Sequence, residues 1–165
     1  MSQELWTAVD RYITDHLVPP DAMLDAALQA SVDAGLPAIS VAPNQGKLLM
    51  LLAQMNGARR ILELGTLGGY STLWLARALP ADGTIITLEF DPKHADVARQ
   101  NFARAGLSSR IDIRVGRALD TLPLLESEGR GPFDLIFIDA DKANIPHYFT
   151  WALKLSHRGT VIIVD

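Results

Sequence analysis

Hydrophobic residues recur at helical spacing through the first third of the chain. A first helix is predicted from Leu5 to Leu17 and ends at the proline pair 19–20. A second helix is predicted after Asp21, and a third from Asn44, its expected N-cap, to Met55. The pattern therefore predicts that residues 1–57 form an N-terminal helical segment packing on a core formed by the rest of the chain.

From residue 58 onward, short apolar runs alternate with helical stretches. Five runs have the character of strands: Arg60–Leu64, Thr84–Leu88, Ile111–Val115, Phe133–Ile138 and Thr160–Val164. Nearly continuous apolar strands are typical of parallel sheets covered on both faces, and enough chain separates each pair for a crossover helix. The pattern predicts a doubly wound, mostly parallel α/β sheet over residues 58–165, within a single domain overall. Such sheets bind ligands beyond the carboxyl ends of their strands, near the point where strand order reverses.

Composition narrows the class of protein. The 165 residues are 48% hydrophobic, enough for one globular core. The net charge of −4 comes from acidic and basic residues scattered along the chain, which argues against a nucleic-acid partner. The absence of cysteine excludes thiolate chemistry. The N-terminus does not resemble a secretory signal and no apolar run approaches ~18 residues, so we expect a cytoplasmic protein without a membrane partner.

Charged residues gather where the predicted strands end. The first strand leads into ELGTLGGYST, residues 63–72, and the second, fourth and fifth strands end at Glu89, Asp139 and Asp165. A carboxylate buried without a partner costs several kcal/mol, so this edge is expected to meet cations or hydrogen-bond donors. The carboxyl edge of the sheet is therefore the predicted site.

The glycine-rich turn and its flanking acids suggest the kind of ligand. Gly65, Gly68 and Gly69 allow a sharp turn that brings backbone N–H groups close to a ligand. The spacing is not G-x-G-x-x-G, and Glu63 would repel a pyrophosphate but suit a cationic ligand. Glu89 follows where an acid accepts hydrogen bonds from ribose hydroxyls. A nucleoside without a pyrophosphate fits this pattern, and a purely structural turn is the alternative.

Four motifs in order, ELGTLGGYS, TLEFD, FDLIFIDADK and VIIVD, resemble the cation-dependent small-molecule O-methyltransferases. This group contains catechol O-methyltransferase and caffeoyl-coenzyme A O-methyltransferase, and the match runs from about Val41 to the last residue. The resemblance implies a Rossmann-like methyltransferase sheet, S-adenosylmethionine as methyl donor and a catechol-like phenol as acceptor. It also implies a homodimer.

The resemblance implies a role for each matching residue of the donor pocket. Glu89 would hold the ribose hydroxyls, Ser71 the methionine carboxylate, Asp141 and the Val41 region the methionine end, and Ala118 the neighbourhood of adenine. Glu63, Gly65 and Tyr70 would shape the wall beside the sulfonium.

In this family the aspartates matching Asp139 and Asp165 coordinate a divalent cation, usually magnesium, together with an asparagine that follows the second. Such a cation stabilises a phenolate as a Lewis acid. Lys142 would take or stabilise the phenol proton, provided that burial and the metal favour its neutral form. The sequence stops at Asp165, so the asparagine and the final strands are missing from it. We therefore expect a C-terminally truncated chain with weakened metal binding and little transfer activity.

Blander interpretations stay open beside these roles. Asp139 and Lys142 could form a simple salt bridge at the sheet edge, and Asp141 could be a helix N-cap. The four histidines, His16, His94, His147 and His157, lack metal-ligand spacing and are expected to be solvated. Trp6, Trp74 and Trp151 are expected in core or interface packing. An NAD-type oxidoreductase and a non-catalytic binding module remain the alternative functions.

Overall fold

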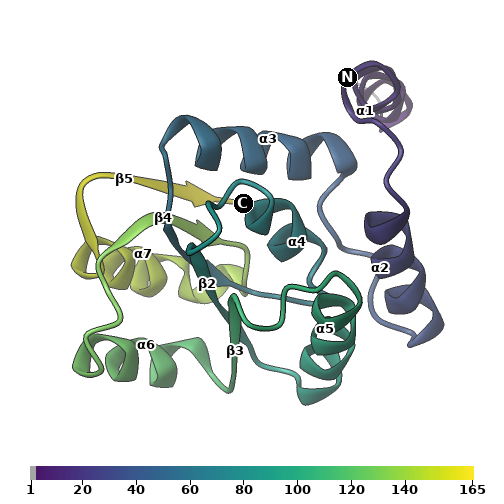
Figure 1. Ribbon diagram of the computed structural model, residues 1–165. Coiled ribbons are helices and arrows are strands. Elements are labelled where there is room, and N and C mark those ends of the chain that lie inside the picture. The colour runs from purple at the N-terminus through teal and green to yellow at the C-terminus, as the bar shows by residue number, and fades with distance from the viewer. Residues whose placement is uncertain (1–2) are drawn as a thin grey trace.

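The computed structural model describes residues 3–165, which form helices and one parallel sheet (Figure 1). The helices are α1 (Gln3–Leu17), α2 (Ala22–Asp33), α3 (Pro43–Met55), α4 (Tyr70–Ala76), α5 (Pro92–Arg104), α6 (Ala118–Ser127), the short 3-10 turn η1 (Lys142–Asn144) and α7 (Ile145–Lys154). The strands are β1 (Arg60–Leu64), β2 (Thr84–Glu89), β3 (Ile111–Val115), β4 (Phe133–Ile138) and β5 (Ser156–Val164).

The five strands lie in the order β3-β2-β1-β4-β5, and each neighbouring pair is parallel. Chain order reverses between β1 and β4. The predicted doubly wound α/β sheet is therefore confirmed. Leu64 at the end of β1 is in register with Leu88 on β2 and Ile138 on β4, so these three strands end at the same level. Their carboxyl ends together form one edge of the sheet.

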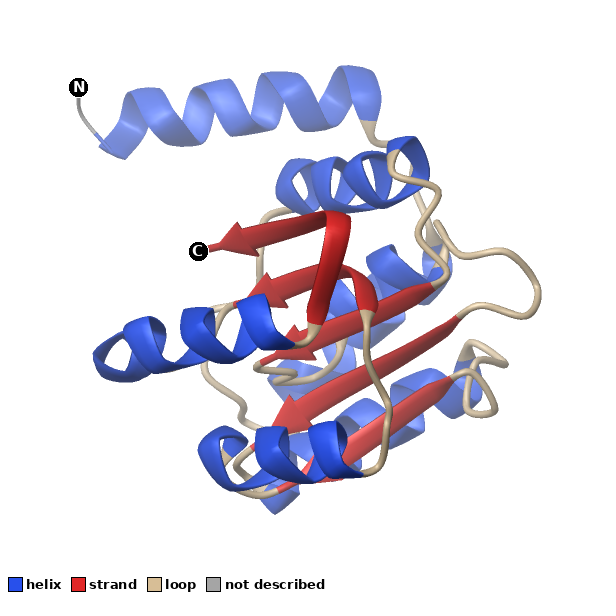
Figure 2. Ribbon diagram, turned by 90° about the vertical axis from the view of Figure 1, so that its left-hand side faces the viewer, coloured by secondary structure: helices blue, strands red, loops and turns tan. Residues whose placement is uncertain are grey.

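Side chains alternate along each strand and build one apolar core on each face. One core joins Ile61 and Ile85 of the sheet to helices α2, α3, α4 and α5. The other joins Leu62 and Ile86 to helices α6 and α7. Figure 2 shows helices in front of the strands and behind them, which is the layered arrangement that covers a parallel sheet.

The first helix lies at the margin of this layered body (Figures 1 and 2). None of the α1 side chains is buried, and Trp6 is 49% exposed. Trp6 therefore does not pack in the core, and its packing at an interface remains a prediction, whereas Trp74 is buried as predicted. Helices α2 and α3 do contribute to the core, through Leu24 and Leu49 among others. The division of the chain at residue 57 remains a prediction.

Two predicted boundaries differ from the structure. Helix α3 begins at Pro43 with Ala42 as N-cap, and Gln45 Oε1 accepts a hydrogen bond from the Ala42 N–H at 2.8 Å. Asn44 is not the N-cap; its side chain donates to Asp10 Oδ1 of α1 at 2.9 Å. Strand β5 begins at Ser156, earlier than predicted, because its register with β4 is irregular between Phe133 and Leu135.

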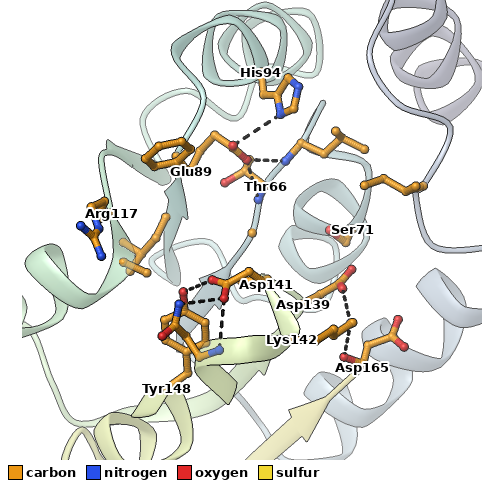
Figure 3. A pocket seen from close by; sticks show the side chains of 18 of the residues that line it. Thr66, Ser71, Glu89, His94, Arg117, Asp139, Asp141, Lys142, Tyr148 and Asp165 are labelled. Atoms are coloured by element: carbon orange, nitrogen blue, oxygen red, sulfur yellow. Dashed lines mark hydrogen bonds and ion pairs between the residues drawn. The ribbon is translucent and has the colours of Figure 1, made fainter. Parts of the chain in front are cut away.

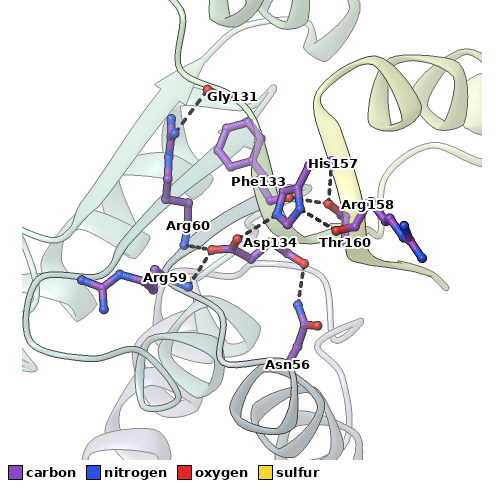
Figure 4. A network of polar contacts seen from close by, with 9 residues as sticks. All are labelled: Asn56, Arg59, Arg60, Gly131, Phe133, Asp134, His157, Arg158 and Thr160. Atoms are coloured by element: carbon purple, nitrogen blue, oxygen red, sulfur yellow. Dashed lines mark hydrogen bonds and ion pairs between the residues drawn. The ribbon is translucent and has the colours of Figure 1, made fainter.

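The irregular start of β5 is held by a polar network at the edge of the sheet opposite the predicted site (Figure 4). The Asp134 carboxylate accepts hydrogen bonds from the backbone N–H groups of Arg59 and Arg60, both at 2.8 Å. His157 Nε2 lies 2.9 Å from the same carboxylate. His157 is exposed, as predicted, and this contact also ties it to β4.

Candidate functional site

A cavity of about 780 Å³ opens at the carboxyl edge of the sheet, beyond the ends of β1, β2 and β4 (Figure 3). Its volume is typical of small-molecule sites, and its position is the one that the fold predicts. Most of the residues predicted for the site line this cavity: Val41, Gly65, Tyr70, Ser71, Glu89, Ala118, Asp139, Asp141, Lys142 and Asp165.

The turn after β1 requires glycine at two positions. Gly65 has φ +94°, and a Cβ built there would lie 1.9 Å from the backbone oxygen of Asp139 on the neighbouring strand end. Gly69 has φ +81°, and its Cβ would lie 2.4 Å from the Phe102 ring. The turn can therefore pass this close to β4 and α5 only without side chains at these positions.

Glu89 fixes the turn from the end of β2. Its Oε2 accepts hydrogen bonds from the backbone N–H groups of Thr66 at 3.0 Å and Leu67 at 2.7 Å, and Oε1 accepts from Asp91 N–H at 2.9 Å. The carboxylate is nearly buried, yet it borders the cavity. It is therefore held in one orientation with lone pairs available for a ligand.

His94 is a cavity residue that the sequence prediction missed. Its Nδ1 lies 3.5 Å from Glu89 Oε1, and its ring borders the cavity (Figure 3). His94 was predicted to be solvated because no metal-ligand spacing surrounds it. Its position depends on how the first turn of α5 folds back toward the end of β2. No local sequence motif predicts this approach.

Glu63 does not line the cavity, in contrast to the other residues predicted for its wall. Its carboxylate is completely buried and accepts hydrogen bonds from the hydroxyls of Ser71 at 2.6 Å, Thr72 and Thr87 at 2.8 Å. Burial raises the pKa of Glu63 to about 7, against the effect of these three hydroxyls. Of this group, only Ser71 reaches the cavity, so it joins Glu63 to the site.

Asp141 is held by its own turn and by α7. It is the N-cap of η1, with Oδ1 accepting from Asn144 N–H at 3.1 Å, and the Tyr148 hydroxyl donates to Oδ2. The interpretation of Asp141 as a cap is therefore confirmed, although the residue also borders the cavity. The Tyr148 hydroxyl lowers the pKa of Asp141, while burial, and next the hydrogen bond to Asp141, raise the pKa of Tyr148 to about 12.

Asp139, Lys142 and Asp165 meet at the mouth of the cavity, where β4 and β5 end (Figure 3). Lys142 Nζ lies 3.5 Å from Asp139 Oδ1 and donates to the backbone oxygen of Asp165. Its side chain is 64% exposed, so the expected burial of Lys142 is not observed. Desolvation first and the negative charge of Asp165 second raise the pKa of Asp139.

Asp139 and Asp165 are the side chains that the sequence resemblance predicts as ligands of a divalent cation. Residues 3–165 contain no group of three or more His, Cys, Asp or Glu side chains arranged to hold a metal ion. Two carboxylates that repel each other nevertheless fit a hard divalent cation, which takes oxygen ligands and keeps several waters.

Within residues 3–165, no helix is both long enough and apolar enough to cross a bilayer.

Comparison with known proteins identifies the family. An O-methyltransferase family profile matches residues 16–165. A catechol O-methyltransferase of Niastella koreensis is 58% identical over the whole chain, which covers 75% of that relative. The structure of a Bacillus cereus O-methyltransferase in complex with SAH has a TM-score of 0.96 at 59% identity, over 98% of this chain and 74% of that one. The O-methyltransferase TomG of Streptomyces achromogenes, solved in complex with SAM, has a TM-score of 0.93 at 52% identity, over 100% and 74%.

The doubly wound sheet, with its cavity at the point where strand order reverses, defines an α/β enzyme of the Rossmann-like methyltransferase class. The chain belongs to the O-methyltransferase family, whose members of this fold depend on S-adenosylmethionine. The resemblance drawn from the four sequence motifs is thereby confirmed at the level of the family.

Proposed function

We propose that this protein transfers a methyl group from S-adenosylmethionine to a phenolic hydroxyl of a catechol-like molecule, with the help of a divalent cation. The oxygen ligands of the site favour Mg²⁺ as this cation. The observation that carries the proposal is the convergence of Glu89, Asp141 and the Asp139–Asp165 pair on one cavity. The acceptor class is inferred from relatives named catechol O-methyltransferase.

The donor would lie along the wall formed by the glycine turn and the ends of β2 and β4. Glu89 would accept hydrogen bonds from the ribose hydroxyls, and its three backbone donors support this role because they fix the carboxylate before the ligand arrives. Ala118 would border adenine. Asp141 and the Val41 region would hold the methionine end, and Gly65 and Tyr70 would lie beside the sulfonium.

Ser71 would contact a different group of the methionine end from the carboxylate that the sequence resemblance implies. Its hydroxyl proton is directed to Glu63, so the oxygen presents lone pairs to the cavity. We therefore assign it to the ammonium of the methionine end, in place of the carboxylate.

The acceptor would enter at the mouth of the cavity, beside Asp139, Asp165 and Lys142. Asp139 and Asp165 would hold the cation, which when bound stabilises a phenolate as a Lewis acid. Lys142 is within reach of this place and would receive or stabilise the phenol proton. The phenolate oxygen then bonds to the methyl carbon while the carbon–sulfur bond breaks, and sulfur keeps the electron pair.

Two measurements test this proposal. Calorimetry should give binding of S-adenosylmethionine and no comparable binding of NAD, because Glu63 and the glycine spacing disfavour a pyrophosphate. A methyl-transfer assay with catechol and Mg²⁺ should give a methoxyphenol at a low rate, because only the two carboxylates of Asp139 and Asp165 would hold the cation, and EDTA should abolish the reaction. Binding of NAD in preference to S-adenosylmethionine would point to an oxidoreductase and would overturn the proposal.

A cytoplasmic homodimer is part of the same proposal. Exposed apolar residues on α1, among them Leu5, Val9 and Leu17, support an interface because such a surface is seldom left in water. Sedimentation or light scattering of the protein would give its mass in solution. A monomer at micromolar concentration would contradict this part alone.

A further inference from the structure

Glu63 lies beneath the floor of the donor cavity and has an unusual set of partners. Its carboxylate is completely buried, and among residues 3–165 its hydrogen bonds come from three neutral hydroxyls. No lysine, arginine or histidine of the described chain forms an ion pair with it. A buried charge without a counter-charge is costly, so this arrangement needs an explanation.

The directions of the hydrogen bonds indicate which form of Glu63 the site is built for. Ser71, Thr72 and Thr87 each donate their single hydroxyl proton to the carboxylate. The Thr87 oxygen in turn lies 2.6 Å from the Thr66 hydroxyl, which must be the donor in that pair because the Thr87 proton is already used. Three donors match an ionised carboxylate, which only accepts.

Within residues 3–165 no basic side chain balances an ionised Glu63, so a cationic ligand in the cavity would supply the balancing charge. Ser71 borders the cavity and contacts Glu63 directly, and Gly65, two residues after Glu63 in the turn that follows β1, borders the cavity as well. A cationic ligand in the cavity would thus lie one side chain away from the buried carboxylate. Burial raises the pKa of Glu63 and the three hydroxyls lower it, so a nearby positive charge would favour the ionised form.

We infer that Glu63 is a specificity-determining residue that favours the cationic methyl donor over its uncharged thioether product. This inference assumes the proposed binding of S-adenosylmethionine in the cavity. Methyl transfer removes the positive charge from sulfur but leaves the ammonium, which both ligands share, so the product loses only the part of the attraction to Glu63 that comes from the sulfonium. Glu63 touches neither reacting atom in this scheme; it acts through its charge and through Ser71.

The test compares two ligands that differ by one methyl group and one charge. Dissociation constants for S-adenosylmethionine and S-adenosylhomocysteine are measured by calorimetry at pH 8.5, with wild-type protein and with Glu63→Gln. The Gln side chain keeps the shape and removes the charge. We expect Glu63→Gln to raise the dissociation constant for S-adenosylmethionine about tenfold, as for the loss of one charge pair in a partly hydrated site. The dissociation constant for S-adenosylhomocysteine should rise by less than about twofold.

Ser71→Ala is the matched control, because it removes a hydrogen bond to Glu63 and a contact in the cavity but keeps the carboxylate. At pH 8.5, above the pKa of about 7 to which burial raises Glu63, the carboxylate stays ionised with its two remaining donors. We therefore expect Ser71→Ala to weaken the binding of both ligands by a similar factor and to leave the ratio of their dissociation constants unchanged. Equal losses for both ligands in Glu63→Gln would overturn the inference while leaving the proposed function intact. If wild-type protein binds neither ligand, the proposed function itself fails.

A second variant keeps the inference testable if Glu63→Gln does not fold. Thr72→Val removes one donor from Glu63 at a position that does not line the cavity. Loss of that donor favours the neutral form of Glu63. At pH 7 the variant should therefore raise the dissociation constant for S-adenosylmethionine roughly threefold, with little change in that for S-adenosylhomocysteine. An equal effect on both ligands, or none on either, would contradict the inference.

Discussion

The Tyr148 hydroxyl donates a hydrogen bond to Asp141 Oδ2, so helix α7 holds a carboxylate that borders the donor cavity. Tyr148 is 4% exposed and its ring packs in the core beneath α7, which gives this hydroxyl a fixed position. Asp141 is therefore oriented from two sides, by the turn that it caps and by a core residue.

Tyr148→Phe should weaken the donor site without unfolding the protein. The ring keeps its packing, while Asp141 loses the hydrogen bond that contributes most to its lowered pKa. We expect the dissociation constant for S-adenosylmethionine to rise roughly fivefold, as for the loss of about 1 kcal/mol from one hydrogen bond. Calorimetry checks this, with Tyr12→Phe on the exposed face of α1 as control; equal affinities in both variants would show that Tyr148 does not orient Asp141.

Gly65→Ala should be far more harmful than alanine at a glycine that has open space. The Cβ at Gly65 would lie 1.9 Å from the Asp139 backbone oxygen, so the turn or the end of β4 must move. At Gly57, φ is also positive but nothing lies within 4 Å. We expect Gly57→Ala to lower the free energy of unfolding by about 1–2 kcal/mol from backbone strain alone. Gly65→Ala should cost more and abolish binding of S-adenosylmethionine; similar unfolding curves and ligand affinities for the two variants would rule out this role for the turn.

The sheet could be predicted from the sequence because the pattern that identifies each strand lies within a few consecutive residues. The bounds of β1, β3 and β4 agree with the prediction residue for residue. The central strands are apolar runs covered on both faces, whereas the edge strand β3 alternates apolar and charged residues. The start of α3 was missed because Ala42 has no capping side chain. The usable signal was Pro43 at the first helical position, with Gln45 reaching back.

The location of the site could be predicted from the sequence, but only some of the contacts within it could. Strand ends that carry Glu89 and Asp139 must meet at one edge of a parallel sheet, so their neighbourhood followed from topology. The burial of Glu63 follows from strand alternation, which puts it on the same face as Ile61 and opposite Thr87 of β2. The approach of His94 depends on how a helix folds back over a strand end, which local sequence does not encode.

Asp139→Asn should weaken Mg²⁺ binding and lower catalysis with little effect on the donor. The variant removes one of two carboxylates whose mutual repulsion contributes to the raised pKa of Asp139. We expect a fall in methyl transfer on the order of 100-fold, because Lewis-acid stabilisation of the phenolate is reduced. Titration with Mg²⁺ and assays with and without EDTA check this, with the surface variant Asp112→Asn as control. Unchanged activity that is equally insensitive to EDTA in wild type and variant would show that these carboxylates hold no catalytic cation.

The Asp134–His157 pair predicts how stability depends on pH at the opposite edge of the sheet. The hydrogen bond to Asp134 raises the pKa of His157, so its stabilising effect is complete below its ordinary value near 6.5 and is lost as pH rises through the raised value. Burial opposes ionisation of Asp134, but the Arg59 and Arg60 N–H groups and His157 lower its pKa overall. Its contribution is present above about pH 4 and is lost as pH falls through the lowered value.

His157→Gln should therefore lower the melting temperature more at pH 5.5 than at pH 8.5. We expect a difference of roughly 1–3 °C between the two losses, since a partly exposed ion pair is screened by solvent. Thermal unfolding followed by circular dichroism measures it, with exposed His147→Gln on α7 as control. A loss that is the same at both pH values would mean that the imidazole stabilises the start of β5 by its neutral hydrogen bonds, to Asp134 and to the Arg158 carbonyl, without a contribution from charge.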